Sequence, residues 1–335
     1  MAPPHLFSAT SSSARQLLIL LRCISFAKTA QVRISPEGIR FTTEDGSFIE
    51  AFVFLDKSLF ASYTYHAPPP PSSQDDPPDP PIFEISLDAL LETLNIFSLS
   101  DPHAARRPGD HDSFAAHRLH RHAGINAFSN PTLGVSGVCT FTYQGEGQPL
   151  TIYMSDAGVT TTCDLTTYEA EGTEEIPFAR DAVAVKTIMR SNALLDAIAE
   201  LSSLNPEILT ITASPSSRPG ADLSLSASGA LGSATVEFQA DGAGDTPILE
   251  THQCGAKTAA SFKFALVKAA QRAMASATKV SVRLDREGVL SLQFLVEVEG
   301  GGAGGGEGVV FVDFRVVPLV DGEDGDEEGS SSGED

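Results

Sequence analysis

The stretch KVSVRLDREGVLSLQF, residues 279–294, gives the clearest sign of the fold. Apolar and polar residues alternate strictly on both sides of a short polar segment that ends in Gly288. Alternation of this kind is typical of half-buried antiparallel strands. A glycine in a tight turn supplies the positive φ that a short hairpin needs. The stretch therefore predicts a β-hairpin with its turn at residues 285–289.

The same turn form occurs twice more, as SPEGI at 35–39 and SDAGV at 155–159. Each again lies between two alternating segments, so we expect three hairpins with Gly38, Gly158 and Gly288 at positive φ. Similar alternation in the remaining chain predicts further antiparallel strands, in segments around 141–154, 209–238 and from 311 onward.

Four segments between these strands have the composition of helices, at 11–24, 87–97, 191–203 and 264–276. In the first, Leu17, Leu20, Leu21 and Ile24 share one face. The second and third resemble each other, DALLE at 88–92 against NALLD at 192–196. A repeated helix together with a repeated hairpin indicates internal duplication.

The sequence therefore predicts an α+β fold of two duplicated domains, each with two helices packed on antiparallel sheets. The length of 335 residues agrees with this division at a rate of roughly 150 residues per domain. The expected organisation is a first domain at 1–165, a connector at 166–182, a second domain at 183–320 and an acidic, disordered tail at 321–335. A Pro-rich loop at 67–81 and an aperiodic insertion at 99–134 interrupt the first domain.

Charge is distributed unevenly along the chain. There are 22 Lys and Arg against 44 Asp and Glu, which gives a formal net charge of −22. The segment 321–335 alone accounts for −8, whereas 1–36 and 251–284 contain no acid and hold ten of the 22 basic residues. The sum argues against a uniformly basic nucleic-acid coat, but the segregation leaves room for a local basic surface.

Several other classes of protein are disfavoured. The four cysteines lie far apart without a C-x-x-C pair, so reduced thiols in an intracellular protein are expected rather than a zinc or disulfide scaffold. No apolar run is long enough for a membrane-spanning helix. Residues 1–36 have the composition of a mitochondrial transit peptide, but strand-like segments overlap them.

The sequence contains no convincing active site, and no metal or cofactor is predicted. Five histidines could hold a metal, but they lie in the aperiodic insertion without a rigid framework; they are His103, His111, His117, His120 and His122. The glycine tract 300–308 is followed by neither a helix nor a Lys-Ser/Thr pair. Asp285 and Glu287 form a D-x-E pair of the kind that metal-dependent nucleases use, but they lie in the expected turn.

Several motifs resemble those of the sliding DNA clamps of the PCNA superfamily, and more specifically the Rad-one subunit family of the nine-one-one checkpoint clamp. They include GIRFTTE at 38–44, ISLDALLETLNIF at 85–97, TYQGEGQPL at 142–150 and GVLSLQF at 288–294. The resemblance extends from about residue 6 to residue 317. It implies a PCNA-like fold in which this chain forms one third of a heterotrimeric ring around double-stranded DNA.

The resemblance also implies where partners bind. The residues expected to face DNA, without reading its sequence, are Arg15, Arg22, Lys28, Arg190, Lys263, Lys268, Arg272 and Lys279. The region expected to bind partner peptides comprises Tyr168, Ile176, Pro177 and Phe178 in the connector. Edge strands near 159–165 and 231–238 are expected beside the two other clamp subunits.

As a member of that family the chain would be a non-enzymatic nuclear protein, placed on DNA by a clamp loader to recruit checkpoint and repair proteins, with no membrane contact. Two alternatives remain open: a 3′→5′ DNA exonuclease using Asp285 and Glu287, and a homotrimeric replication clamp. One feature does not match helices that face DNA: helices 87–97 and 191–203 carry four acids and no internal Lys or Arg.

Overall fold

The computed structural model describes residues 5–67, 80–98, 138–156, 159–170, 172, 175–216, 220, 222–239, 247–299 and 307–319. Most of the Pro-rich loop lies outside these residues. So do the whole insertion 99–134 with its histidines, the glycine tract up to residue 306 and the acidic tail.

The described elements repeat one pattern, a strand followed by a helix and three strands. The first unit is β1 (Phe7–Ser11), α1 (Ala14–Cys23), β2 (Thr29–Ile34), β3 (Gly38–Asp45) and β4 (Ile49–Asp56), followed by the short helix η1 (Lys57–Leu59) and β5 (Ser62–Tyr65). The second is β6 (Ile82–Ser86), α2 (Leu87–Ser98), β7 (Val138–Tyr143), β8 (Leu150–Asp156) and β9 (Val159–Leu165).

The second half begins after the short helix η4 (Arg180–Ala182). Its first unit is β10 (Val183–Arg190), α4 (Ser191–Ser202), β11 (Pro206–Ala213), β12 (Leu223–Gly229) and β13 (Gly232–Phe238), followed by β14 (Leu249–Cys254). The last unit is β15 (Thr258–Lys263), α5 (Phe264–Lys268), α6 (Gln271–Ser276), β16 (Lys279–Asp285), β17 (Leu290–Glu299) and β18 (Glu307–Val316).

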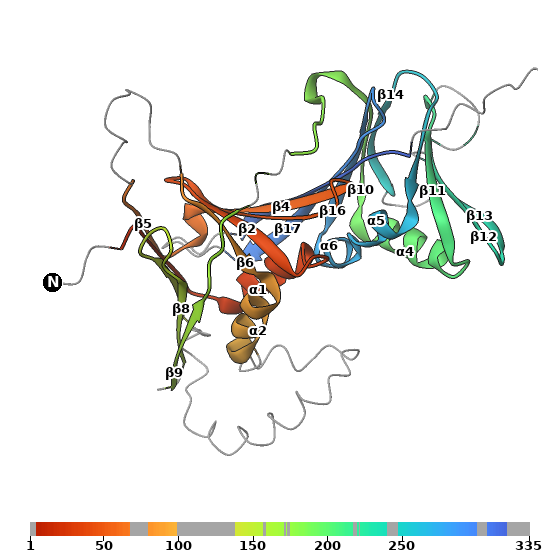
Figure 1. Cartoon of the computed structure of the whole chain (residues 1–335). Coiled ribbons are helices and arrows are strands. Elements are labelled where there is room, and N and C mark those ends of the chain that lie inside the picture. The colour runs from red at the N-terminus through yellow and green to blue at the C-terminus, as the bar shows by residue number, and fades with distance from the viewer. Residues whose placement is uncertain are drawn as a thin grey trace, which may run out of the picture.

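The strands form three antiparallel sheets. One sheet of nine strands, in the order β14-β10-β16-β17-β18-β4-β3-β2-β6, runs through both halves of the chain. Its two halves join where β18 pairs with β4, with Val312 opposite Val53. Sheets of five strands (β5-β1-β7-β8-β9) and four strands (β13-β12-β11-β15) flank it on either side, and the helices lie below it in Figure 1. The expected α+β architecture is confirmed.

All three expected hairpins form. Asp156 is opposite Val159 in the β8–β9 pair, although Gly158 itself lies outside the described residues. Ile34 is opposite Ile39 in the β2–β3 pair, and Leu284 is opposite Leu290 in the β16–β17 pair. Gly288 has the expected positive φ of 84°, whereas the expectation for Gly38 is wrong. Gly38 is required for another reason, since a Cβ there would collide with the carbonyl oxygen of Leu55 on the neighbouring strand.

The helices at 11–24, 87–97 and 191–203 form close to the expected bounds, but the single helix expected at 264–276 is wrong. It is divided into α5 and α6. The buried residues Phe264, Val267, Ala270 and Ala273 recur every three positions, and a regular α-helix would rotate them off one face. A tighter turn, in which the Ala270 N–H donates to the Val267 carbonyl at 3.2 Å, keeps them on the core side.

Backbone hydrogen bonds show the duplication directly. The N–H of Leu87, at the start of α2, donates to the carbonyl of Lys28 before β2 at 2.8 Å. In the second half the N–H of Ser191, at the start of α4, donates to the carbonyl of Thr278 before β16 at 3.1 Å. The two helices that resemble each other in sequence therefore occupy equivalent positions against equivalent strands.

The basic N-terminal stretch is part of this core. Leu17, Leu20, Leu21 and Ile24 of α1 and its C-terminal cap are each at most 2% exposed, and they pack in one continuous cluster with the sheets. Residues 7–34 therefore contribute a strand, a helix and a second strand to the folded chain. All four cysteines are free thiols, as expected. Among the described residues, no helix combines the length and apolar character that a bilayer crossing requires.

Candidate nucleic-acid interface

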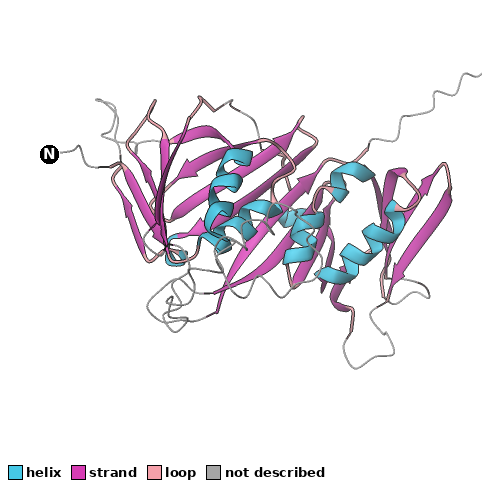
Figure 2. Ribbon diagram, turned by 90° about the horizontal axis from the view of Figure 1, so that it is seen from below, coloured by secondary structure: helices cyan, strands magenta, loops and turns pink. Residues whose placement is uncertain are grey.

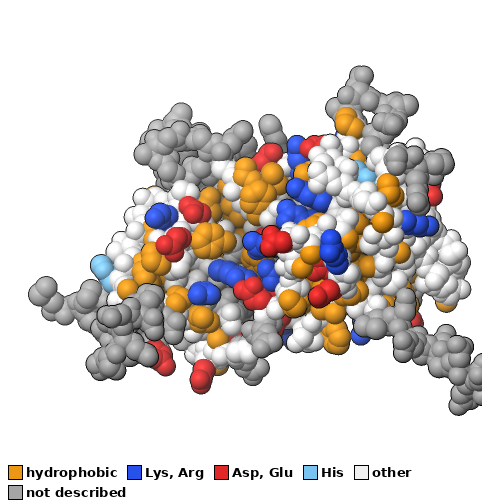
Figure 3. All heavy atoms as spheres, turned by 90° about the horizontal axis from the view of Figure 1, so that it is seen from above, with side chains coloured by type: hydrophobic (Ala, Val, Ile, Leu, Met, Phe, Trp, Pro, Cys, Tyr) orange, Lys and Arg blue, Asp and Glu red, His pale blue; other side chains and the backbone are white. Residues whose placement is uncertain are grey.

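The helices form one layer against the sheets. Helix α1 packs against both α2 and α6, and α6 packs in turn against α4. The order across the layer is therefore α2, α1, α6, α4, with α5 leading into α6. Figure 2, seen from below, shows these helices in front of the sheets. Figure 3 looks from above onto the opposite face of the molecule. Helices from the two halves of the chain thus meet where α1 contacts α6.

Exposed basic side chains lie on the central helices. Arg22 is exposed, and its Nη2 donates to the Oδ1 of Asn95 on α2 at 3.5 Å. Arg272 of α6 is exposed and donates to both the carbonyl and the hydroxyl oxygen of Ser25, just after α1. Arg15, half-buried, lies two turns before Arg22 on the same helix. These contacts hold the guanidinium of Arg22 against α2 and that of Arg272 against the segment just after α1.

Two further lysines predicted to face DNA also lie on this helical layer or at its rim. Lys268 of α5 is exposed, and its Nζ donates to the Oγ of Ser202 at the end of α4 at 2.7 Å. Lys28 is exposed in the segment between α1 and β2. Arg15, Arg22, Lys268 and Arg272 therefore lie on the helical layer, and Lys28 lies just before β2.

The other three predicted residues lie at the ends of strands. In β16 the side chains of Val280, Val282 and Leu284 face the core, so Lys279 lies on the opposite face of the strand. Its Nζ pairs with Oε2 of Glu250 at 2.8 Å. The same alternation places Arg190 on the outer face of β10.

Lys263 also lies at a strand end. It ends β15, where the preceding Phe262 is buried, and its ammonium lies 4.9 Å from the ring centroid of Phe48 in the β3–β4 turn. Period-two alternation at the strand ends was the signal that could have separated Arg190, Lys263 and Lys279 from the helical cations in the sequence.

The outer helices carry the opposite charge. Asp88 and Glu92 on α2, and Asp196 and Glu200 on α4, are exposed. None of the four makes an ion pair among the described residues. Glu92 and Asp196 occupy equivalent positions of the two related helices. The helical layer is thus basic along α1, α5 and α6 and acidic on α2 and α4.

Both strands expected to contact neighbouring subunits are sheet edges. β9 ends the five-stranded sheet and β13 ends the four-stranded sheet. The two edges lie at opposite ends of the molecule in Figure 1. Their unpaired backbone groups are of the kind that pair with another strand.

The connector is fastened first to the edge strand β6 of the nine-stranded sheet and then, near Ile176, to the outer face of that sheet. Tyr168 exchanges two backbone hydrogen bonds with Glu84 of β6, at 2.8 and 2.9 Å. Farther along, Ile176 is buried at 5% exposure, Pro177 is exposed and Phe178 is half-buried. Tyr168, at 58% exposure, and Pro177 are therefore the members of the predicted peptide-binding region that a partner reaches most readily.

A cluster of four charged residues, the connector clamp, holds the connector near Ile176. It consists of Arg40 on β3, Glu50 on β4, Glu175 in the connector and Arg315 on β18. The Nη1 atom of Arg40 lies 2.7 Å from Oε1 of Glu175, and Arg315 lies 3.3 Å from the other oxygen of that carboxylate. Both guanidinium groups also lie 3.6 Å from an oxygen of the buried Glu50.

Burial and charge shift the two carboxyl groups of the clamp in opposite directions. Burial raises the pKa of Glu50, and the attraction of Arg315 offsets only part of that effect. Burial also acts to raise the pKa of Glu175, but Arg40 and Arg315 outweigh it and leave the pKa below its usual range. The sequence gives no indication of this cluster, because its members are single charges up to 275 positions apart.

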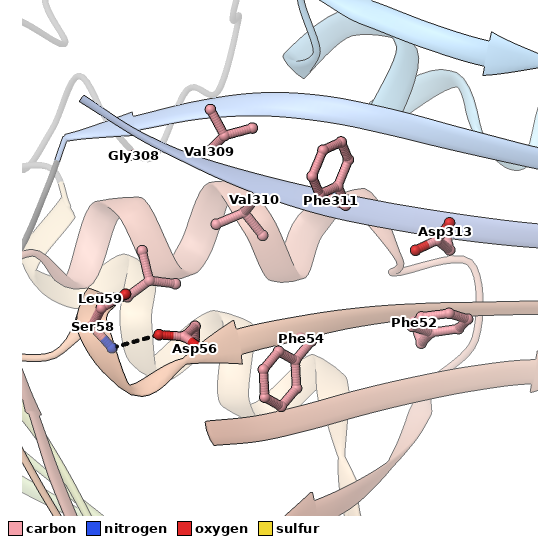
Figure 4. A pocket seen from close by; sticks show the side chains of 10 residues that line it. All are labelled: Phe52, Phe54, Asp56, Ser58, Leu59, Gly308, Val309, Val310, Phe311 and Asp313. Atoms are coloured by element: carbon pink, nitrogen blue, oxygen red, sulfur yellow. Dashed lines mark hydrogen bonds between the residues drawn. The ribbon is translucent and has the colours of Figure 1, made fainter. Parts of the chain in front are cut away.

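An apolar pocket opens on the same outer face, between β4 and β18. Its volume is about 220 Å³, and Figure 4 shows Phe52 and Phe54 on one strand facing Val309 and Phe311 on the other. Phe54, Val309 and Phe311 are between 38% and 49% exposed. The guanidinium of Arg40 lies 4.1 Å from the ring centroid of Phe52, which links the pocket to the connector clamp. Figure 3 shows apolar and basic side chains side by side on this face.

Asp285 of the suggested nuclease pair has a structural role. Asp285 is 1% exposed, and Oδ1 of its carboxylate accepts the N–H groups of Glu287 and Val289 at 3.0 and 2.9 Å. Its Oδ2 accepts the N–H of Ala179 in the connector at 3.1 Å. Glu287 is exposed. Asp285 thus closes the β16–β17 turn and ties the end of the connector to it, and no group of three potential metal ligands occurs among the described residues.

Comparison with known proteins identifies the family. The sequence matches the family described as Repair protein Rad1/Rec1/Rad17 over residues 6–296. It is 29% identical to the DNA damage checkpoint control protein rad1 of Schizosaccharomyces pombe, over 94% of this chain and 87% of that protein. It is 26% identical to the human cell cycle checkpoint protein RAD1, over 92% and 90% of the two chains.

A solved structure shows the fold independently of close sequence similarity. Proliferating Cellular Nuclear Antigen from Entamoeba histolytica superposes with a TM-score of 0.64 over 95% of this chain and all of that one, at 14% identity. With the fold of a PCNA-like clamp and a family match across most of its length, the chain belongs to the Repair protein Rad1/Rec1/Rad17 family.

Proposed function

We propose that this chain is one subunit of a heterotrimeric checkpoint clamp that encircles double-stranded DNA in the nucleus. A clamp loader places the ring on DNA, and the ring then recruits checkpoint and repair proteins. The family membership and the checkpoint names of its relatives support this role. The chain acts in it as a scaffold, without a reaction of its own.

The observation that carries the proposal is the position of the two edge strands. A module that presents one unpaired strand at each end, β9 and β13, is suited to join a neighbour on both sides. Such head-to-tail contacts close into a ring when the rotation between subunits is right. The helices then line the inside, where their exposed cations contact phosphates without reading sequence.

The outer face supports the recruiting role. It carries the connector, with Tyr168 and Pro177 exposed, and the apolar pocket between β4 and β18. Small apolar pockets with a few polar groups at the rim are typical places for a short peptide to anchor. A partner can bind there while the helices on the opposite face remain on DNA.

Light scattering on the purified chain, alone and with the two other clamp subunits of the same organism, tests the assembly. We expect a monomer alone and a 1:1:1 complex in the mixture. A self-assembled trimer would instead support the homotrimeric replication clamp. A chain that neither self-assembles nor joins the other subunits would contradict any ring.

A further inference from the structure

We propose that the acidic side chains of α2 and α4 weaken and guide the grip of this subunit on DNA, confining phosphate contacts to the central helices. This inference rests on the proposed clamp function and concerns the control of that same DNA-binding surface. The basic ridge is defined here as Arg15, Arg22, Lys268 and Arg272. The acidic flanks are Asp88 and Glu92 on one side and Asp196 and Glu200 on the other.

The first support is the order of the helices. Since α1 and α6 contact each other and lie between α2 and α4, the flanks border the ridge on both sides. The ridge crosses from the first half of the chain to the second through the contact of Arg272 with Ser25. DNA that follows the ridge therefore lies between two acidic borders.

The second support is that the flank carboxylates keep their charge available. All four are exposed and make no ion pair among the described residues. By contrast, Glu50, Glu175 and Glu250 are each paired with a basic residue. An unpaired carboxylate repels a phosphate over about a Debye length, ~10 Å at 0.1 M salt, which is comparable to the spacing between packed helices.

The third support is the contact between ridge and flank. Arg22 donates to Asn95, a neutral residue of α2, and Lys268 donates to Ser202, a neutral residue of α4. Arg22 and Lys268 are thus positioned by neutral groups of the flanking helices, and no ion pair joins them to the flank acids among the described residues. Positive and negative stripes remain separate, as a guiding surface requires.

The test compares two variants of the full chain with the same change in net charge. The flank variant carries Asp88→Asn, Glu92→Gln, Asp196→Asn and Glu200→Gln. The control variant carries Glu37→Gln, Glu146→Gln, Glu169→Gln and Glu297→Gln, which are exposed and lie outside the helices. Fluorescence anisotropy with a labelled DNA duplex, at about 0.05 and 0.15 M salt, gives the dissociation constants.

We expect the flank variant to bind at least about threefold more tightly than the natural chain, with a smaller gain at the higher salt. The control variant should bind within about twofold of the natural chain, since its charges lie away from the helical layer. Equal gains in both variants, or no gain in the flank variant, would overturn the proposal. Circular dichroism confirms folding, and a smaller variant with only Glu92→Gln and Asp196→Asn covers the case in which the fourfold variant fails to fold.

A separate measurement distinguishes this inference from the clamp function itself. Rings assembled with the two partner subunits are loaded on closed circular DNA, and the fraction retained is measured before and after linearisation. Loss of the natural ring from circular DNA would contradict encirclement. If the natural ring stays on circular DNA but the flank variant stays no longer than the natural ring on linear DNA, only the guiding role is contradicted.

Discussion

The Oε2 atom of Glu50 accepts a hydrogen bond from the backbone N–H of Ile176 at 3.1 Å. The carbonyl of the same Ile176 accepts a hydrogen bond from Arg315 at 2.7 Å. Glu50 lies on β4 in the first half of the chain and Arg315 on β18 in the second half. Glu50 and Arg315 are opposite each other in the β4–β18 pair, so one connector residue is held by both halves at the place where they join in the nine-stranded sheet.

Replacing Glu50 with Ala should destabilise the protein by about 2–4 kcal/mol, because it leaves the Ile176 N–H and two guanidinium groups without their buried acceptor. Chemical denaturation measures the change. Glu44→Ala is the matched control, since Glu44 lies directly opposite Glu50 on the neighbouring strand but is exposed. If Glu50→Ala loses no more stability than the control, the connector clamp contributes little to the stability of the protein.

Acid should weaken the connector clamp through Glu175. Because the folded-state pKa of Glu175 lies below its ordinary value, its contribution to stability is present above the unfolded pKa of about 4.3 and is lost as the pH falls through the folded value. Glu50 acts in the opposite sense, since its folded pKa is raised. Glu175→Gln should therefore flatten the loss of stability below about pH 4.3.

Unfolding curves recorded across this range measure the effect. Glu169→Gln serves as the control, because Glu169 is an exposed acid of the same connector that makes no ion pair among the described residues. If the stability of Glu175→Gln falls with decreasing pH as steeply as that of the natural chain, the assigned role of this carboxylate is contradicted.

Gly38→Ala should destabilise the protein by roughly 1–3 kcal/mol, because the new methyl group meets the carbonyl of Leu55 on β4 and the paired strands β3 and β4 must separate there. Gly255→Ala is the matched control. A Cβ at Gly255 meets nothing within 4 Å, and this glycine does not have a positive φ. Thermal unfolding should show a lower midpoint for the first variant and an equal or higher one for the second.

The sequence predicted the repeating elements well because their patterns are local. Alternation located β16 and β17, and the DALLE and NALLD segments located α2 and α4 in equivalent places. The failures involve neighbours distant in sequence. The need for Gly38 depends on Leu55, and the break between α5 and α6 depends on how Ala270 packs in the core. The charge partners of Glu50 are Arg40 and Arg315, which lie on two widely separated segments, and no local pattern reveals such a pairing.

The exonuclease alternative can be tested without disturbing the fold. Glu287 is exposed, so Glu287→Gln should change stability by less than about 0.5 kcal/mol. Asp285→Asn should destabilise by about 1–3 kcal/mol, because the amide accepts the three backbone N–H groups less well than the carboxylate. Incubation with labelled DNA and Mg²⁺ should show no degradation by the natural chain. Degradation that disappears in Glu287→Gln would establish the alternative site.

Charge reversal on the basic ridge should weaken retention of the assembled ring on DNA. Each lost phosphate contact lowers the salt dependence of binding, with a slope of about −0.9 per contact on duplex DNA, so reversing Arg15, Arg22, Lys268 and Arg272 should reduce both affinity and slope. Deletion of 321–335 removes a charge of −8 without touching the helices and should leave retention intact. Retention is measured on circular DNA over a range of salt. Equal effects of the two changes would mean that net charge, and not the position of the ridge, governs the grip.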